Sequence, residues 1–202
     1  MVPQKRYKPH TSSDRRRYTD DVNLEPSVYF YMSKPDELGI PLRDALRGRF
    51  ARLVGCNEPM FKECGPSLSV CLDVSHYTTC EMYQCLMPYD QWPGYRPWSR
   101  QIRIRDFQFR NPPGPITRSN LAKNVAKSVA RFIAVNIFSN HRDKYLMGSV
   151  QEHQGRPMEE DGDPIWAVGA HKIEVNDLVL VRLDNASKNS WQAHLQLLCP
   201  RS

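Results

Sequence analysis

The strongest constraint on the fold is a helical repeat of apolar residues between Leu121 and Ile133. Apolar side chains recur there at every third or fourth position, so an α-helix would gather them on one side. Thr117 or Ser119 can cap the start of such a helix. The pattern predicts a helix over about 117–139, with an apolar stripe that must pack against another element. The stripe consists of Leu121, Val125, Val129, Phe132 and Ile133.

A second, shorter helix is expected to begin near Pro41. Proline suits the first position of a helix, where its missing N–H group costs nothing. Apolar residues follow it at helical spacing, and we expect the helix to cover about 41–54. The apolar positions are Leu42, Leu46, Phe50 and Leu53.

Several segments have the pattern of β-strands. Residues 67–74 and 191–197 alternate apolar and polar side chains, which is typical of a strand with one face on the core. Residues 27–32 are short and rich in β-forming side chains, and residues 178–183 are an almost continuous apolar run. Because 184–189 has loop composition, the last two strands are expected to form a hairpin. These patterns predict an α+β fold, with a mainly antiparallel sheet and one long and one shorter packed helix.

The chain is expected to form one α+β domain over 27–202, preceded by a disordered basic arm over 1–26. A length of 202 residues favours one domain, and 40% apolar residues is ordinary globular usage. No apolar run approaches the roughly 18 residues of a membrane-spanning helix. No apolar stretch follows the charged N-terminus, as it would in a signal peptide. We therefore expect a cytoplasmic or nuclear protein whose six cysteines are reduced thiols.

The positive charge is concentrated in two segments. The formal net charge is +6, of which residues 1–18 contribute +5 and residues 100–131 contribute +7, so the rest of the chain carries −6. Such segregation is typical of proteins that bind polyanions, although a solvated tail and a charged helix face would produce the same pattern. The charge distribution therefore predicts an acidic partner but does not distinguish a nucleic acid from an acidic protein.

Residues 92–131 are the best candidate for the binding surface because they combine aromatic rings, arginines and a basic helix. Arginine and lysine neutralise phosphates, and flat rings can stack on bases. The alternative is that the rings fill the core and the basic helix face is merely solvated. We expect a non-catalytic intracellular binding protein that engages nucleic acid or an acidic protein segment. The residues expected to contact the partner are Arg100, Arg103, Arg105, Arg118, Lys123, Lys127 and Arg131, with Tyr95 and Trp98 as stacking groups.

The cysteine-rich segment could hold zinc, which takes four thiolate or imidazole ligands in a tetrahedron. Cys71, His76, Cys80 and Cys85 are the candidate ligands, but none of them forms the closely spaced pairs of a zinc knuckle. Free thiols packed as small apolar groups are the preferred interpretation. No cofactor is expected.

An enzyme of unknown class is the alternative function. The sequence contains no nucleophile elbow, no phosphate-binding glycine loop and no His-Glu-x-x-His motif. His141 with Asp143, or His153 beside Glu152, could form an acid–base pair after folding, but sequence spacing does not test this.

Two stretches resemble uncharacterised proteins of mushroom-forming (basidiomycete) fungi. One runs from Trp92-Pro-Gly-Tyr-Arg-Pro-Trp98 through the segment 113–127, and the other joins Asp177-Leu-Val-Leu-Val-Arg182 to Ser190-Trp-Gln192. The resemblance covers roughly residues 90–200. It implies a fungal protein of unassigned activity and transfers no site residue.

Overall fold

A computed structural model of the chain describes residues 25–62, 66–72, 92, 95, 98–106, 114–142, 164–169, 171–187 and 190–199, without the side chains of 71, 138–142 and 187. The basic arm expected over 1–26 lies almost wholly outside these residues.

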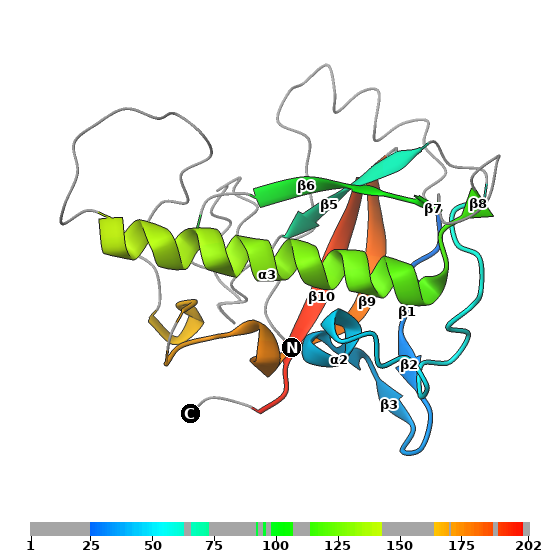
Figure 1. The fold of residues 1–202 in the computed structure, drawn as a ribbon, viewed down its shortest axis with the longest axis horizontal. Helices are drawn as coiled ribbons and strands as arrows, with labels where there is room; N and C mark the ends of the chain where they lie inside the picture. Colours follow the sequence, from blue (N-terminus) through cyan, green and yellow to red (C-terminus); the bar gives the residue numbers. More distant parts are fainter. Residues whose placement is uncertain are drawn as a thin grey trace, which may run out of the picture.

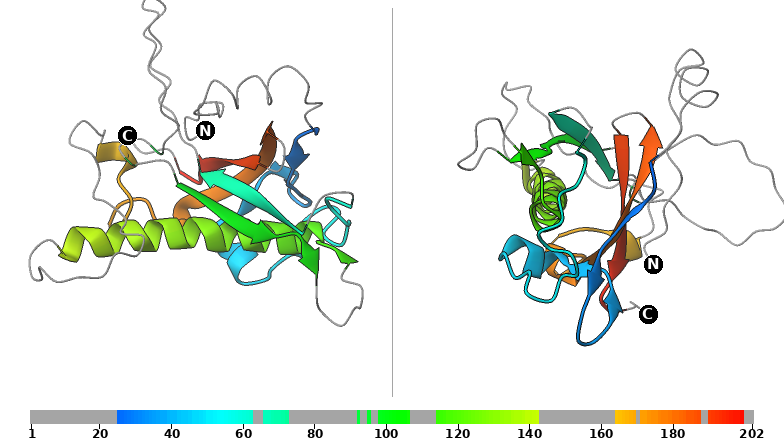
Figure 2. Two further views of the ribbon diagram at one scale, coloured as in Figure 1. Left: turned by 90° about the horizontal axis from the view of Figure 1, so that it is seen from above. Right: turned by 90° about the vertical axis from the view of Figure 1, so that its right-hand side faces the viewer.

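A curved six-stranded sheet and a long helix form the two layers of the structure (Figures 1 and 2). The strand order is β1-β9-β10-β5-β6, and β4 also pairs with β9. All pairs are antiparallel except β10 with β5, so the predicted mainly antiparallel α+β fold is confirmed. The strands of this sheet are β1 (Val28–Tyr29), β4 (Ile40–Pro41), β5 (Ser67–Leu72), β6 (Trp98–Arg103), β9 (Leu178–Ser187) and β10 (Ser190–Leu197).

The remaining elements lie around this sheet. Two small antiparallel pairs, β2 with β3 and β7 with β8, flank it, and α2 packs against α3. Their bounds are β2 (Tyr31–Met32), β3 (Glu37–Leu38), β7 (Arg105–Asp106), β8 (Gly114–Pro115), α2 (Leu42–Leu46), α3 (Arg118–Arg142) and the 3-10 turns η1 (Pro164–Trp166) and η2 (Val175–Asp177).

The long helix forms as its apolar repeat predicts. All five residues of the predicted stripe, from Leu121 to Ile133, are buried. The inward-facing residues of β10, among them Trp191 and Ala193, are buried in the same core cluster. Figure 2 shows that the sheet curves around α3, with β5 and β6 on one side of the helix and β9 and β10 on another.

The shorter helix ends earlier than the sequence predicts. We expected a helix over about 41–54, but α2 stops at Leu46. Gly48 adopts a φ of +72°, in the left-handed region that terminates helices. Farther along, Leu53 forms a β-bridge with Met32. Pairing with the β2 segment therefore replaces the last turns of the expected helix.

The C-terminal hairpin is longer than expected. Residues 184–187, which have loop composition, continue β9 to Ser187, and β10 begins at Ser190. Asp184 and Asn185 thereby become strand residues that pair with Gln192 and Trp191. The loop assignment was wrong here because pairing with β10 overrides the weak local preference of these residues.

Phe132 lies at the centre of an aromatic cluster between α3 and the sheet. Its ring centroid is 5.6 Å from that of Trp92 and 5.8 Å from those of Tyr95 and Trp98. Two hydrogen bonds attach the η1 segment to this cluster. Trp92 Nε1 donates to the Trp166 carbonyl at 2.6 Å, and the Tyr95 hydroxyl accepts from the Val168 N–H at 3.0 Å.

Removal of the Phe132 ring should destabilise the whole fold. Phe132→Ala leaves a cavity that three aromatic neighbours share, and we expect a loss of about 3–5 kcal/mol in the free energy of unfolding. Urea denaturation followed by tryptophan fluorescence measures it. Arg131→Ala is the matched control, because the adjacent side chain is exposed and its removal should cost within about 0.5 kcal/mol. Equal losses for the two variants would contradict this account of the core.

Candidate functional site

The outer face of α3 carries three cations opposite its buried stripe. Lys123, Lys127 and Arg131 follow one another at intervals of four residues, so they rise by about 6 Å per step along the helix axis. Lys127 and Arg131 are exposed, and Lys123 is partly exposed. Within the described residues, none of the three forms an ion pair or a side-chain hydrogen bond. We refer to these three residues as the α3 cation row.

Arg100 lies beside this row. Trp98 contacts Phe132, and Asn124 Nδ2 donates to the Arg103 carbonyl at 3.3 Å, so β6 runs along α3 between these two points. Arg100 alternates with buried Ile102 on the side of β6 that faces the helix, and it is half-buried. Arg100 is therefore on the α3 side of β6, and it is the predicted β6 arginine that we group with the cation row.

Three other predicted contact residues do not join the row. Arg103 is exposed at a β6 position that alternates with the helix-facing side chains, so it lies on the other face of the strand. Arg105 donates to the Lys62 carbonyl at 3.4 Å. Arg118 is occupied by Glu58 and by the Tyr29 carbonyl, and it acts as an internal tie. The sequence predicted one surface for all of these residues because it shows neither the strand face nor the hydrogen-bond partners of each side chain.

The two predicted stacking groups serve the core instead. Tyr95 is 2% exposed, and burial raises the pKa of its hydroxyl, although the hydrogen bond with Val168 opposes that effect. Trp98 is half-buried against Phe132. The aromatic rings fill the space between helix and sheet, so the exposed position expected for them is not found.

The other sequence candidates fall largely outside the described residues. His76, Cys80, Cys85, Asp143, Glu152 and His153 lie there, as do the side chains of Cys71 and His141. Among the residues that the structure does describe, no group of three or more His, Cys, Asp or Glu side chains could hold a metal ion. Cys56 and Cys199 are free thiols.

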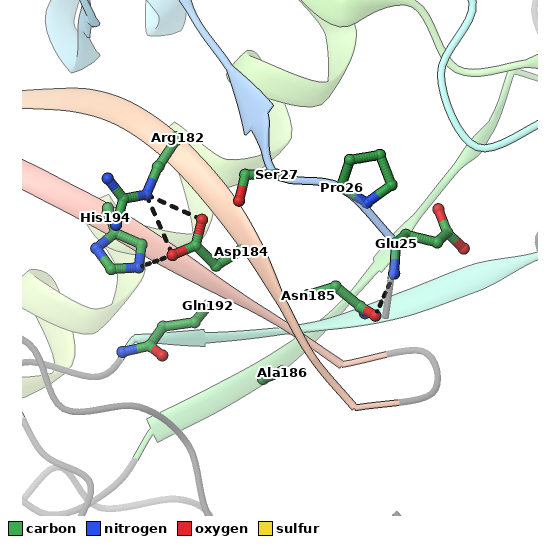
Figure 3. A pocket seen from close by; sticks show the side chains of 9 residues that line it. All are labelled: Glu25, Pro26, Ser27, Arg182, Asp184, Asn185, Ala186, Gln192 and His194. Carbon is green, nitrogen blue, oxygen red and sulfur yellow. Dashed lines mark hydrogen bonds and ion pairs between the residues drawn. The ribbon is translucent and has the colours of Figure 1, made fainter. Parts of the chain in front are cut away.

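A polar cluster that the sequence analysis missed lies on the outer face of the β9–β10 hairpin. Arg182 and His194 are directly paired in the strand register, and Asp184 is paired with Gln192. Arg182 Nε donates to both oxygens of Asp184, at 2.9 and 3.1 Å. His194 Nε2 lies 2.7 Å from Asp184 Oδ2. One carboxylate therefore holds two neighbouring side chains in place (Figure 3).

The pKa values of Asp184 and His194 are both lower than usual. Burial raises the pKa of Asp184, but hydrogen bonds from Ser27 and Arg182 and the charges of His194 and Arg182 outweigh burial, so its pKa lies below the usual value. Burial lowers the pKa of His194, and the opposing effect of Asp184 does not restore it. At neutral pH the cluster therefore contains an ionised carboxylate and a neutral imidazole.

A cavity of about 390 Å³ lies over this cluster. Segment 25–27 forms one side, and the hairpin forms the floor (Figure 3). Asn185 fixes that segment, because its Oδ1 accepts from the Glu25 N–H at 3.0 Å while its Nδ2 donates to the Ser190 carbonyl at 3.2 Å. The lining residues are Glu25, Pro26, Ser27, Arg182, Asp184, Asn185, Ala186, Gln192 and His194.

The sequence does contain a signal for this cluster. The polar residues Gln192 and His194 alternate with the apolar residues Trp191, Ala193 and Leu195, a pattern that served above only to identify the strand. Extending β9 through Asp184 would have put Arg182 and Asp184 on the same outer face. The loop composition of 184–189 concealed that continuation.

Comparison of the chain with protein-family models, curated proteins and solved structures gives no match. The resemblance to basidiomycete proteins therefore stays a prediction. Among the described residues, no helix is both long and apolar enough to cross a membrane.

The lowered pKa of His194 should make the fold less stable in acid. Between pH 7 and pH 5 the unfolded chain takes up a proton at this histidine near its ordinary value of about 6.5, whereas the folded chain takes it up only at lower pH. His194→Gln removes this contribution. Urea unfolding at pH 7, 6 and 5 should therefore show a shallower loss of stability for the variant than for the wild type. Parallel curves would show that His194 is not held neutral by the fold.

Proposed function

We propose that the protein is a non-catalytic intracellular binding protein, working in the cytosol or the nucleus, that engages an acidic partner through the α3 cation row and Arg100. The observation that carries this proposal is that the row faces away from the core with no ion-pair partner among the described residues. Cations that stabilise a fold are usually paired, as Arg118 and Arg182 are here. Unpaired cations in a regular row are available to an external anion.

The chemistry of the row favours contact by charge alone. Its side chains are spaced by one helical turn, and the neighbouring Tyr95 and Trp98 rings are packed against the core. Phosphates of a nucleic acid and carboxylates of an acidic protein segment can both form ion pairs with such a row. Because the Tyr95 and Trp98 rings pack against the core, binding to a nucleic acid would depend on its backbone and little on its sequence.

Charge reversal on the row should weaken binding to a polyanion. We expect Lys127→Glu with Arg131→Glu to reduce the affinity for a fluorescein-labelled mixed-sequence DNA duplex and to flatten its salt dependence, by about 0.9 in the log–log slope for each lost phosphate contact. Fluorescence anisotropy between 50 and 200 mM salt measures both quantities. Labelled poly-glutamate, titrated in parallel, represents an acidic protein segment.

The matched control is Lys62→Glu with Arg103→Glu, which makes the same charge change at exposed residues away from the row. This control should retain most of the affinity. Equal losses in both double variants would mean that overall charge, and not the row, attracts the polyanion. If the wild type binds neither the duplex nor poly-glutamate, the proposed function is wrong.

A further inference from the structure

The cavity over the β9–β10 hairpin presents hydrogen-bonding groups that the fold does not use. Arg182 is fixed by Asp184 through Nε, and its guanidinium lies over the Tyr29 ring at 5.8 Å from the centroid. Within the described residues, its two terminal nitrogens have no hydrogen bond. An arginine that is oriented through Nε and by a stacked ring is well prepared to bind an oxyanion with its free fork.

His194 offers a second unused nitrogen next to this fork. Its Nε2 is engaged by Asp184, and Nδ1 has no partner among the residues that the structure describes. In the described part of the chain, only Arg118 Nε and Ser128 Oγ are buried side-chain atoms that lack a partner. Nδ1 of His194 and the terminal nitrogens of Arg182 therefore reach solvent, and both residues line the same cavity.

We propose that this cavity binds a small phosphate monoester, with the phosphate oxygens on the Arg182 fork and one shared proton between the phosphate and His194 Nδ1. Arginine pairs with phosphate through two parallel hydrogen bonds. A monoester has a second pKa near 6, so its singly charged form carries one O–H group to donate to the imidazole. A carboxylate has no proton to give, and it would meet the lone pair of a neutral histidine.

The rest of the cavity limits the size and character of the ester group. A volume of about 390 Å³ is near the lower end of small-molecule sites. Figure 3 shows Glu25 and Asn185 on the opposite side of the cavity from Arg182, with Ser27 between the two sides and Gln192 next to Asp184 and His194. This lining is polar and suits an alcohol or polyol better than an apolar group, and the carboxylate of Glu25 disfavours a second phosphate. A compact, hydroxyl-bearing monoester therefore fits better than a polymer backbone.

The experiment is isothermal titration of the full chain with glycerol 3-phosphate from pH 6 to pH 8.5. The charged and titratable groups around His194 in the described residues are Asp184 and Arg182 on β9, Tyr29 on β1, and Glu25 across the cavity. Above pH 7 the complex should hold one proton more than the separate partners, so the affinity should fall by up to about tenfold per pH unit. Sulfate, which has no proton to donate to His194, should bind more weakly than glycerol 3-phosphate.

Two variants separate recognition from folding. Arg182→Lys keeps the charge but loses the fork, and we expect at least a tenfold loss of affinity. His194→Gln can still donate to Asp184, and it should bind with much less dependence on pH. Thermal unfolding checks that both variants are folded. Binding that is unaffected by Arg182→Lys, a wild-type affinity that does not change with pH, or no detectable binding of glycerol 3-phosphate would each overturn the proposal.

The proposal is independent of the function assigned to the α3 cation row. The Lys127→Glu, Arg131→Glu double variant should bind glycerol 3-phosphate as the wild type does. A loss of glycerol 3-phosphate binding in that variant would mean that the phosphate binds to the helix, and it would contradict the proposed cavity site. Failure of the duplex and poly-glutamate titrations would leave the result for glycerol 3-phosphate unchanged.

Discussion

The packing of the α3 apolar stripe against the inner face of the sheet determines the positions of both candidate sites. Leu121, Val125 and Val129 are fully buried, so the helix can rotate little about its axis without exposing them. That orientation turns Lys127 to the solvent side. The inward positions of β10 are fixed in the same way by Trp191, and alternation then sends His194 to the outer face. The cation row and the polar cluster therefore both follow from the burial of apolar side chains.

Asp184 determines the geometry of the polar cluster. Its carboxylate accepts hydrogen bonds from Arg182, His194 and Ser27, and partial burial of the group is compensated by these donors. A half-buried ion pair of this kind contributes little net stability, because desolvation offsets much of the Coulomb attraction. Its effect is on geometry: it fixes the rotamers of two adjacent side chains, and one edge of each has no partner within the described part of the chain. A network that only stabilised the fold would not require those edges to face a cavity.

The sequence predicted what depends on local periodicity and missed what depends on long-range contacts. The long helix and the alternation of β10 were predictable because each is a repeat within one element. The end of α2 was not, because Leu53 pairs with Met32, which lies 21 positions earlier in the chain. Burial of Tyr95 was not predictable either, since its partner Val168 is far along the chain. The cluster around Asp184 could not be predicted because it depends on the pairing of Asp184 with Gln192, whereas the composition of 184–189 indicated a loop.

The two sites lie on opposite sides of a shared core. The α3 cation row faces away from the sheet, whereas the cavity lies on the sheet face that points away from α3, with Trp191 and Ala193 buried between the layers. Substitutions at distant sites without common partners have nearly additive effects, so each site can change its charge without altering the other. One face presents cations that have no fixed partner among the described residues, which suits an extended polyanion. The other presents a single oriented arginine beside a neutral imidazole, which suits one compact anionic group. The same layered fold can therefore accommodate two different classes of anionic ligand.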